Sequence, residues 1–368
     1  MKIPPVNLTA EYREIKSDLN SRLNKIFSTA QFILGDEVRE CESRFAKLIG
    51  TKFAIGVNSG TDALYLSLIA LGIGKGDEVI TTPMTYIATG MAIARTGAKP
   101  VFVDIDPETF DINPDLIPKA ITERTKAIMP VHLYGTPCDM TKIMAIAKKH
   151  KLRVIEDCAQ STGAKWRGKT TGSFGDCGAF SFYPTKIVGA YGDGGMITTN
   201  QPKLAEVLRS LRAQSDPHKK YIHDRIGFNS RLDSVQAAVI NAKLNHFARW
   251  NKQRERAAKF YDHQLSKIPG IKILKRINGR QDVIHQYGIL VSDRDRILNE
   301  LKQQGIAVGI YYPIPLHLQP CFKYLRYKRG DFPEAERIIS HVLNLPIFPQ
   351  ITFEQQRFTV SKVKEFYS

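Results

Sequence analysis

The stretch Met140 to Asp157, MTKIMAIAKKHKLRVIED, contains the pattern that decides the fold. Residues 140–150 are predicted to form a helix, and residues 153–157 a short strand with an apolar centre. Asp157 stands at the end of that strand. A helix followed directly by a buried strand is the repeating unit of a parallel sheet whose connecting helices lie on both faces.

The same alternation extends in both directions along the chain. Helices are predicted over residues 62–71, 87–96 and 115–121, and strands over residues 77–82, 101–104, 127–131, 178–182 and 195–199. The predicted fold class is therefore α/β with a mostly parallel sheet. Ligands of such sheets bind beyond the carboxyl ends of the strands. We expect the loops that carry Tyr86, His132, Asp157 and Lys186 to hold the chemistry.

The pattern changes near residue 250. A long helical stretch follows Asp233 and runs through residues 251–265. Strands at 285–291 and 306–312 then flank a helix at 293–304. Two domains are therefore predicted, a large one of residues 1–250 and a smaller α+β domain of residues 251–368.

The composition is that of an ordinary soluble protein, with 43% hydrophobic and 24% charged residues among 368. The N-terminus lacks a signal-peptide pattern and no apolar run reaches the ~18 residues of a membrane helix, so a cytoplasmic protein without a membrane partner is expected.

Five cysteines without a C-x-x-C pair favour neither a metal site nor a disulfide framework. The net charge of +17 could serve to bind nucleic acid. Because no recognised nucleic-acid module accompanies the short basic clusters, no nucleic-acid partner is expected.

Two glycine-rich stretches do not match nucleotide-binding fingerprints. Residues 72–76, GIGKG, lie after a predicted helix and before a predicted strand, which favours a helix C-cap and turn. Residues 189–195, GAYGDGG, also precede a strand. Because the sequence has no G-x-x-x-x-G-K-[ST] motif either, a nicotinamide or ATP enzyme is disfavoured.

Three short elements point instead to one cofactor. Residues 58–61, NSGT, offer backbone N–H groups at a helix start, which suits a phosphate, although an ordinary N-cap has the same pattern. Asp157 can pair with the protonated nitrogen of a pyridine ring, or simply cap a helix. Lys186 ends the segment SFYPTK of residues 181–186, where it is either a desolvated nucleophile or a surface lysine.

Together and in this order, the elements resemble a fold-type I pyridoxal-phosphate (PLP) enzyme, and most closely the DegT/DnrJ/EryC1/StrS family of sugar aminotransferases. The resemblance covers nearly the whole chain. Its motifs are FILG (32–35), NSGTDAL (58–64), EDCAQ (156–160), SFYPTK (181–186), FNSRLD (228–233) and YPIPLH (312–317). It implies a large domain of the aspartate-aminotransferase type, with PLP as cofactor and pyridoxamine phosphate as its intermediate form.

The resemblance also implies roles for single residues. Lys186 is the catalytic lysine that binds the cofactor as a Schiff base and shuttles the proton, and Asp157 forms a salt bridge to the pyridine nitrogen. Tyr86 stacks on the ring, and Gln160 lies beside the ring or its hydroxyl. The phosphate ligands are Gly60, Thr61, Ser181 and, from the neighbouring subunit, Asn229. A homodimer with shared active sites is thereby implied.

Candidate contacts to sugar or nucleotide form a second group. They are Tyr183, Arg231, Tyr312 and His317. For the two tyrosines, structural packing is the alternative interpretation. His132 is interpreted as a hydrogen-bonded core histidine rather than a cofactor contact.

The activity implied is transfer of an amino group from L-glutamate to a nucleotide-linked keto sugar. Lysine rather than histidine at position 186 favours transamination over sugar dehydration. The motifs are most similar to those of enzymes that aminate a dTDP-3-keto-6-deoxyhexose, a step of deoxyamino-sugar and surface-glycan (lipopolysaccharide O-antigen) biosynthesis. Ile187-Val188 and Tyr311 depart from that subgroup. Two alternatives stay open: a 4-aminotransferase for a GDP- or UDP-linked 4-keto sugar, and a non-catalytic regulatory or nucleic-acid-binding relative.

Overall fold

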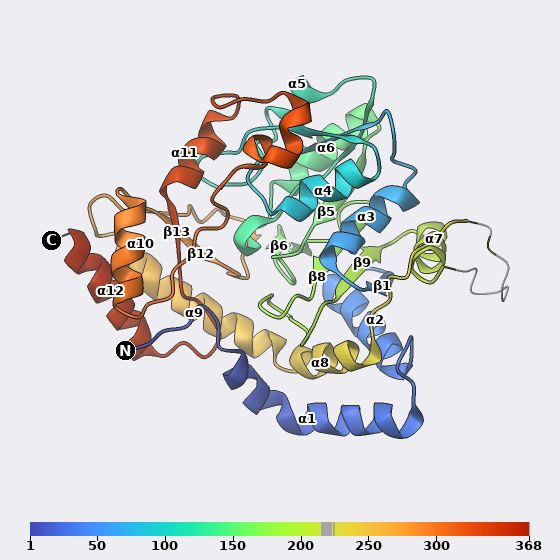
Figure 1. The fold of residues 1–368 in the computed structure, drawn as a ribbon, viewed down its shortest axis with the longest axis horizontal. Coiled ribbons are helices and arrows are strands. Elements are labelled where there is room, and N and C mark those ends of the chain that lie inside the picture. The colour runs from blue at the N-terminus through green and yellow to red at the C-terminus, as the bar shows by residue number, and fades with distance from the viewer. Residues whose placement is uncertain (215–222, 224, 368) are drawn as a thin grey trace.

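The computed structural model describes residues 1–214, 223 and 225–367, and is centred on a seven-stranded sheet (Figure 1). The strands, in spatial order, are β1 (Phe53–Val57), β9 (Gly195–Thr199), β8 (Cys177–Ser181), β5 (Arg153–Asp157), β4 (Thr125–Ile128), β2 (Glu78–Thr81) and β3 (Lys99–Phe102). Only β9 runs antiparallel to its neighbours β1 and β8; the other pairs are parallel. The predicted mostly parallel sheet is confirmed.

Helices cover both faces of this sheet, as predicted, because successive side chains of a strand point to opposite faces. Ile155 of β5 packs into one hydrophobic core and the adjacent Val154 into another. The helices on the Ile155 face are α3 (Gly60–Ala70), α4 (Ile87–Arg95) and α7 (Pro202–Arg212). Those on the opposite face are α2 (Asp36–Ile49), α5 (Ile117–Ala120), α6 (Met140–His150) and α8 (Ser234–Leu244).

The C-terminal third of the chain builds a second core. Its three-stranded antiparallel sheet has the order β10 (Lys272–Ile273), β12 (Tyr287–Leu290) and β13 (Val342–Leu345). The helices packed on it are α9 (Phe247–Leu265), α10 (Arg294–Gln303) and α12 (Phe353–Tyr367). Ile3 joins this core from the N-terminus. Because α9 runs unbroken across residue 250, the predicted boundary falls inside a helix. The division into two domains stays a prediction.

Shorter elements connect the two cores. They are α11 (Pro333–His341), the small sheet β11 (Arg280–Gln281), β6 (Lys165–Trp166) and β7 (Lys169–Thr170), and the 3-10 turns η1 (Leu133–Gly135), η2 (Leu316–Leu318) and η3 (Pro320–Leu325). The GIGKG stretch is the predicted helix end and turn, with Gly72 and Gly76 at positive φ. Among the described helices, none combines the length and apolar character that crossing a bilayer requires.

Two element predictions need correction. Residues 306–312 do not form a regular strand, because Ile306 pairs with Ile3 while Gly309 pairs with Asn344, so no single neighbour supplies a continuous ladder. The long helical stretch after Asp233 is two helices, α8 and α9, separated at Asn245 and His246.

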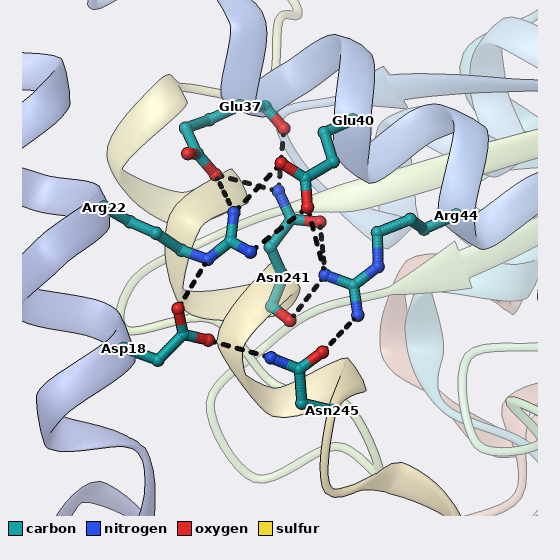
Figure 2. Close-up of polar contacts among 7 residues, drawn as sticks. All are labelled: Asp18, Arg22, Glu37, Glu40, Arg44, Asn241 and Asn245. Atoms are coloured by element: carbon teal, nitrogen blue, oxygen red, sulfur yellow. Dashed lines mark hydrogen bonds and ion pairs between the residues drawn. The ribbon is translucent and has the colours of Figure 1, made fainter.

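A polar network fixes the N-terminal helix α1 (Leu8–Thr29) to the body of the protein (Figure 2). Arg22 donates to Glu37 of α2 at 2.8 Å and to Glu40 at 3.1 Å. Asn241 of α8 donates to the same Glu37 at 2.9 Å. The members of the network are Asp18, Arg22, Glu37, Glu40, Arg44, Asn241 and Asn245. The buried carboxylate of Glu37 therefore accepts hydrogen bonds from Arg22 of α1 and Asn241 of α8, which ties both helices to α2.

Candidate active site

A cavity of about 490 Å³ opens where β5 and β8 end, at the carboxyl edge of the parallel strands. The predicted site residues that line it are Gly60, Thr61, Tyr86, Asp157, Gln160, Ser181, Tyr183, Lys186 and Tyr312. They come from β5, β8, the starts of α3 and α4, and the segment before η2. The structure therefore gathers most of the predicted residues in one place.

Asp157 is a buried carboxylate, 5% exposed, at the last position of β5. Its Oδ2 accepts a hydrogen bond from Thr89 Oγ1 at 2.8 Å, and its Oδ1 accepts from the backbone N of Ala159 at 3.2 Å. Burial raises the pKa of Asp157, while these two donors and the charge of Lys186 act in the opposite direction. Because a carboxylate can accept about four hydrogen bonds, Asp157 retains capacity for a cationic N–H from a ligand.

Lys186 lies in the loop after β8 and shares the cavity with Asp157. Its backbone N donates to Tyr183 O at 2.8 Å, closing the turn that directs the side chain. Burial lowers the pKa of Lys186 from 10.5 to about 8, and Asp157 opposes this shift only in part. A lysine with this pKa is partly neutral near physiological pH, so it can act as a nucleophile and as a base.

A second group of lining residues is suited to bind a phosphate. Gly60 begins α3, and Ser59 caps that helix by accepting from Asp62 N at 3.1 Å. A Cβ added to Gly60 would lie 2.6 Å from the Cβ of Ser181, which brings the helix start against the end of β8. Free backbone N–H groups at a helix N-terminus bind anions, and the hydroxyls of Thr61 and Ser181 add donors. This cradle fits the phosphate of PLP, as Asp157 fits its ring nitrogen and Lys186 its aldehyde.

A substitution at Gly60 tests this cradle. Gly60→Ala forces Ser181 or the helix start to move, and we expect the affinity of the apoprotein for PLP to fall about tenfold to a hundredfold, the effect of one disturbed charge-assisted hydrogen bond. Titration followed by the absorbance of the bound cofactor measures it. Gly74→Ala is the matched control, because its Cβ meets only Thr96 O at an ordinary 3.6 Å. Equal affinities in the two variants would remove Gly60 from the phosphate site.

Aromatic side chains also line this cavity. Tyr86, at the start of α4, is 53% exposed, and its ring centroid lies 5.3 Å from that of Tyr312. Gln160 donates from Nε2 to the hydroxyl of Tyr312 at 3.1 Å and accepts at Oε1 from Tyr134 N at 2.7 Å. The contact joins a residue after β5 to one from the C-terminal third. Both sides of the cavity are thereby tied together.

Three predicted residues lie outside the cavity of this chain. Asn229 is exposed and accepts from Arg231 Nη2 at 2.6 Å. The phosphate contact of Asn229 in a neighbouring subunit and the substrate contact of Arg231 stay predictions. His317 is 2% exposed, packs on Phe332 at 4.8 Å between centroids, and bonds to Glu336 through Nε2 at 3.0 Å. The structure gives His317 a packing role and does not bring it to the cavity lining.

His132 is a hydrogen-bonded core histidine, as predicted. It is fully buried; Nδ1 accepts from the backbone N of Cys138 and Nε2 lies 3.1 Å from Glu156 Oε2. His132, Glu156 and Cys158 place ligand-type atoms within 4.8 Å of one another. Glu156 also accepts from three backbone N–H groups of the loop Gly172–Gly175. Because these donors satisfy its charge, Glu156 is accounted for as a structural anchor beneath Asp157.

Sequence reasoning missed several residues of the site. Thr89, which donates to Asp157, lies inside the predicted helix at residues 87–96, and no sequence pattern marks it as a site residue. Val6 and His285 line the cavity from segments that are far apart in the sequence. Neither follows a predicted strand of the main sheet, so the rule about carboxyl ends could not find them.

Comparison with known proteins agrees with a PLP-binding cavity. The model of the DegT/DnrJ/EryC1/StrS aminotransferase family matches residues 13–364. A "Pleiotropic regulatory protein" of Geobacillus stearothermophilus is 48% identical, covering 100% of this chain and 99% of its own length. A UDP-N-acetyl-3-dehydro-alpha-D-glucosamine 3-aminotransferase of Acidithiobacillus ferrooxidans is 45% identical, with coverages of 96% and 95%.

Two further matches, one sequence and one crystal structure, come from Streptomyces venezuelae. A dTDP-3-amino-3,4,6-trideoxy-alpha-D-glucose transaminase is 40% identical over 99% of this chain and 96% of its own. The crystal structure of DesV in complex with a ketimine intermediate matches with a TM-score of 0.97 at 39% identity, covering 100% of this chain and 99% of that one. The fold, the cavity and the matched length agree, and the protein belongs to the DegT/DnrJ/EryC1/StrS family of PLP-dependent aminotransferases.

Proposed function

We propose that this enzyme transfers an amino group from L-glutamate to carbon 3 of a dTDP-linked 3-keto-6-deoxyhexose. It does so in the cytoplasm, as a homodimer, in the biosynthesis of a deoxyamino sugar for a surface glycan such as O-antigen. The observation that carries the proposal is the joint placement of Asp157 and Lys186 in one cavity with the Gly60–Ser181 cradle.

The residues of the cavity divide the chemistry among them. Bound PLP supplies an electron sink for the electrons left when a proton departs from a carbon beside nitrogen. Asp157 keeps the ring nitrogen protonated by pairing with it. Nζ of Lys186 takes the proton from the α-carbon of L-glutamate, and in the sugar half of the cycle it delivers a proton to carbon 3 of the sugar. The phosphate cradle fixes the ring so that both transfers use the same geometry.

The position of the new amino group is supported by two of the relatives. The names of the Acidithiobacillus ferrooxidans and Streptomyces venezuelae enzymes both place it at carbon 3 of the sugar, whereas their nucleotides are UDP and dTDP. We therefore favour carbon 3 over carbon 4. For dTDP and the 6-deoxy sugar, the support is the likeness of the segments around His132, Lys186 and Leu316 to that subgroup.

The homodimer is supported by an exposed apolar surface beside the Asn229 segment. Phe27, Phe32 and Ile33 are 61%, 44% and 51% exposed, and Ile33 forms a bridge with Asp233. Apolar side chains gathered in this way favour an interface. Asn229 is exposed and stands four residues before Asp233, and in the proposed dimer it reaches the phosphate of the neighbouring subunit. Light scattering should give twice the mass of one chain.

Absorbance spectra test the two half-reactions separately. The yellow band of the PLP form should fade when L-glutamate is added and return when the dTDP-3-keto-6-deoxy sugar follows; mass and NMR analysis of the product then locates the amino group. Fading without return contradicts the sugar assignment and raises the 4-keto alternative with GDP or UDP. If the yellow band does not fade when L-glutamate is added, L-glutamate is not the amino donor.

A regulatory role is the second candidate, and the name of the Geobacillus stearothermophilus relative is the observation that favours it. A regulator that acts by binding nucleic acid needs no cofactor lysine, and its affinity falls steeply with salt. We place the regulatory role second because one cavity contains every group expected to bind PLP: Lys186, Asp157, Gly60 and Ser181. A DNA-binding assay across salt concentrations with Lys186→Ala separates the two.

A further inference from the structure

His285 is a buried histidine in the wall of the active-site cavity. Only 5% of it is exposed, and Nδ1 has no hydrogen-bond partner among the described residues. No role has been assigned to it so far. Buried polar groups are nearly always hydrogen-bonded, so an unsatisfied one beside a catalytic lysine calls for a ligand or a moving side chain as its partner.

Backbone contacts fix the point from which the His285 side chain enters the cavity wall. His285 N donates to Tyr134 O at 2.8 Å, and Tyr134 N donates to Gln160 Oε1 at 2.7 Å. Gly135, at φ +91°, leaves room for this contact, because a Cβ there would lie 3.0 Å from His285 N. One turn, η1, therefore orients both Gln160 and His285 toward the cavity.

The surroundings keep the imidazole neutral. Burial, then the charge of Lys186, then that of Arg254 on α9 lower the pKa of His285 well below its usual value. Arg254 donates to Ile347 O at 3.0 Å, so it is held in place beside the ring. A neutral imidazole keeps one nitrogen as an acceptor. Lys186 lines the same cavity as His285 and is a donor that can serve it.

We propose that His285 is a positioning residue that accepts a hydrogen bond from Nζ of Lys186 whenever that amine is not joined to the cofactor. The proposal deepens the function proposed above and rests on it. A lysine side chain has a flexible four-carbon stem, and proton transfer requires its amine to stand close to the reacting carbon. An acceptor fixed by η1 restricts the amine to that part of the cavity.

The test compares His285→Phe, which keeps the ring shape without nitrogen, with His285→Gln, which keeps a polar group. The apoproteins of both variants should still capture PLP. Single turnovers are measured with L-glutamate, or with L-glutamine if only that donor bleaches the unmodified enzyme. The rate of this half-reaction in His285→Phe should be lower by about tenfold or more, because the amine that moves the proton is misplaced. With α-deuterated donor its isotope effect should rise, because proton transfer becomes rate-limiting. His285→Gln should recover most of the rate.

The remaining outcomes overturn the proposal. An unchanged rate and isotope effect in His285→Phe removes the contact, and loss of PLP capture in that variant assigns a structural role instead. His263→Phe, at an exposed site on α9, is the control for introducing phenylalanine. The donor half-reaction contains no sugar, so a wrong sugar assignment fails only in the second half-reaction and is distinguished from a failure here.

Discussion

Replacing Lys186 by alanine is expected to lower transamination by roughly 10⁴-fold, because the nucleophile and the group that moves the proton are lost together. The measurement is amino transfer at saturating donor, with PLP in excess. Lys203→Ala, an exposed lysine on α7, is the matched control and should keep full activity. Substantial turnover in Lys186→Ala would refute the catalytic role of this lysine and move the chemistry to another site.

The same variant should be more stable than the parent when no cofactor is bound. In the parent, burial lowers the pKa of Lys186 from 10.5 to about 8, so the folded state disfavours the protonated amine. That cost is fully present below pH 8 and disappears above pH 10.5. One pKa unit corresponds to about 1.4 kcal/mol; with screening at the cavity mouth and the weaker pairing of Asp157, we expect a gain of about 1–3 kcal/mol.

Urea unfolding of both apoproteins at pH 6.5 and near pH 10 measures this gain. The difference in the free energy of unfolding should be largest at pH 6.5 and small near pH 10. A destabilised Lys186→Ala protein would mean that lost packing outweighs the buried charge. Its inactivity would then require a separate test of folding by circular dichroism.

Asp157 and Lys186 could be predicted from the sequence because each follows a strand with a clear apolar pattern. The position of a strand end is a local property, and parallel strands bring their carboxyl ends together. The same logic placed Gly60 and Thr61 at a helix start beside β8. Local pattern was therefore sufficient wherever a residue belongs to the main sheet or to the helix that follows one of its strands.

Residues placed by the second core could not be found in that way. Val6 and His285 follow Ile3 and Ile284, which belong to the same core in the C-terminal third, and no local pattern records that these distant segments meet. The sugar or nucleotide contact of His317 stays a prediction. Its observed partners, Phe332 and Glu336, lie beside and on α11, and they become its neighbours only through tertiary packing.

Asp157→Asn is expected to lower turnover by roughly 10²- to 10³-fold, the typical cost of removing one preorganised electrostatic contact, while the variant still captures PLP through Lys186. Asparagine keeps the shape and can still accept from Ala159 N, but it cannot hold the ring nitrogen in its protonated form. Thr89→Val, which leaves the carboxylate and removes only one of its donors, should have a smaller effect of about tenfold.

The pH dependence of PLP capture separates this electrostatic role from a packing role. The charge of Asp157 raises the pKa of Lys186, so removing it should lower that pKa further below about 8. The neutral, reactive amine then persists to lower pH, and the rise of the capture rate with pH should occur at lower pH in Asp157→Asn than in the parent. A residue that only filled space would reduce turnover and leave this profile in place. An unshifted profile combined with full turnover would show that the ring nitrogen has another partner, and the assignment of Asp157 would fail.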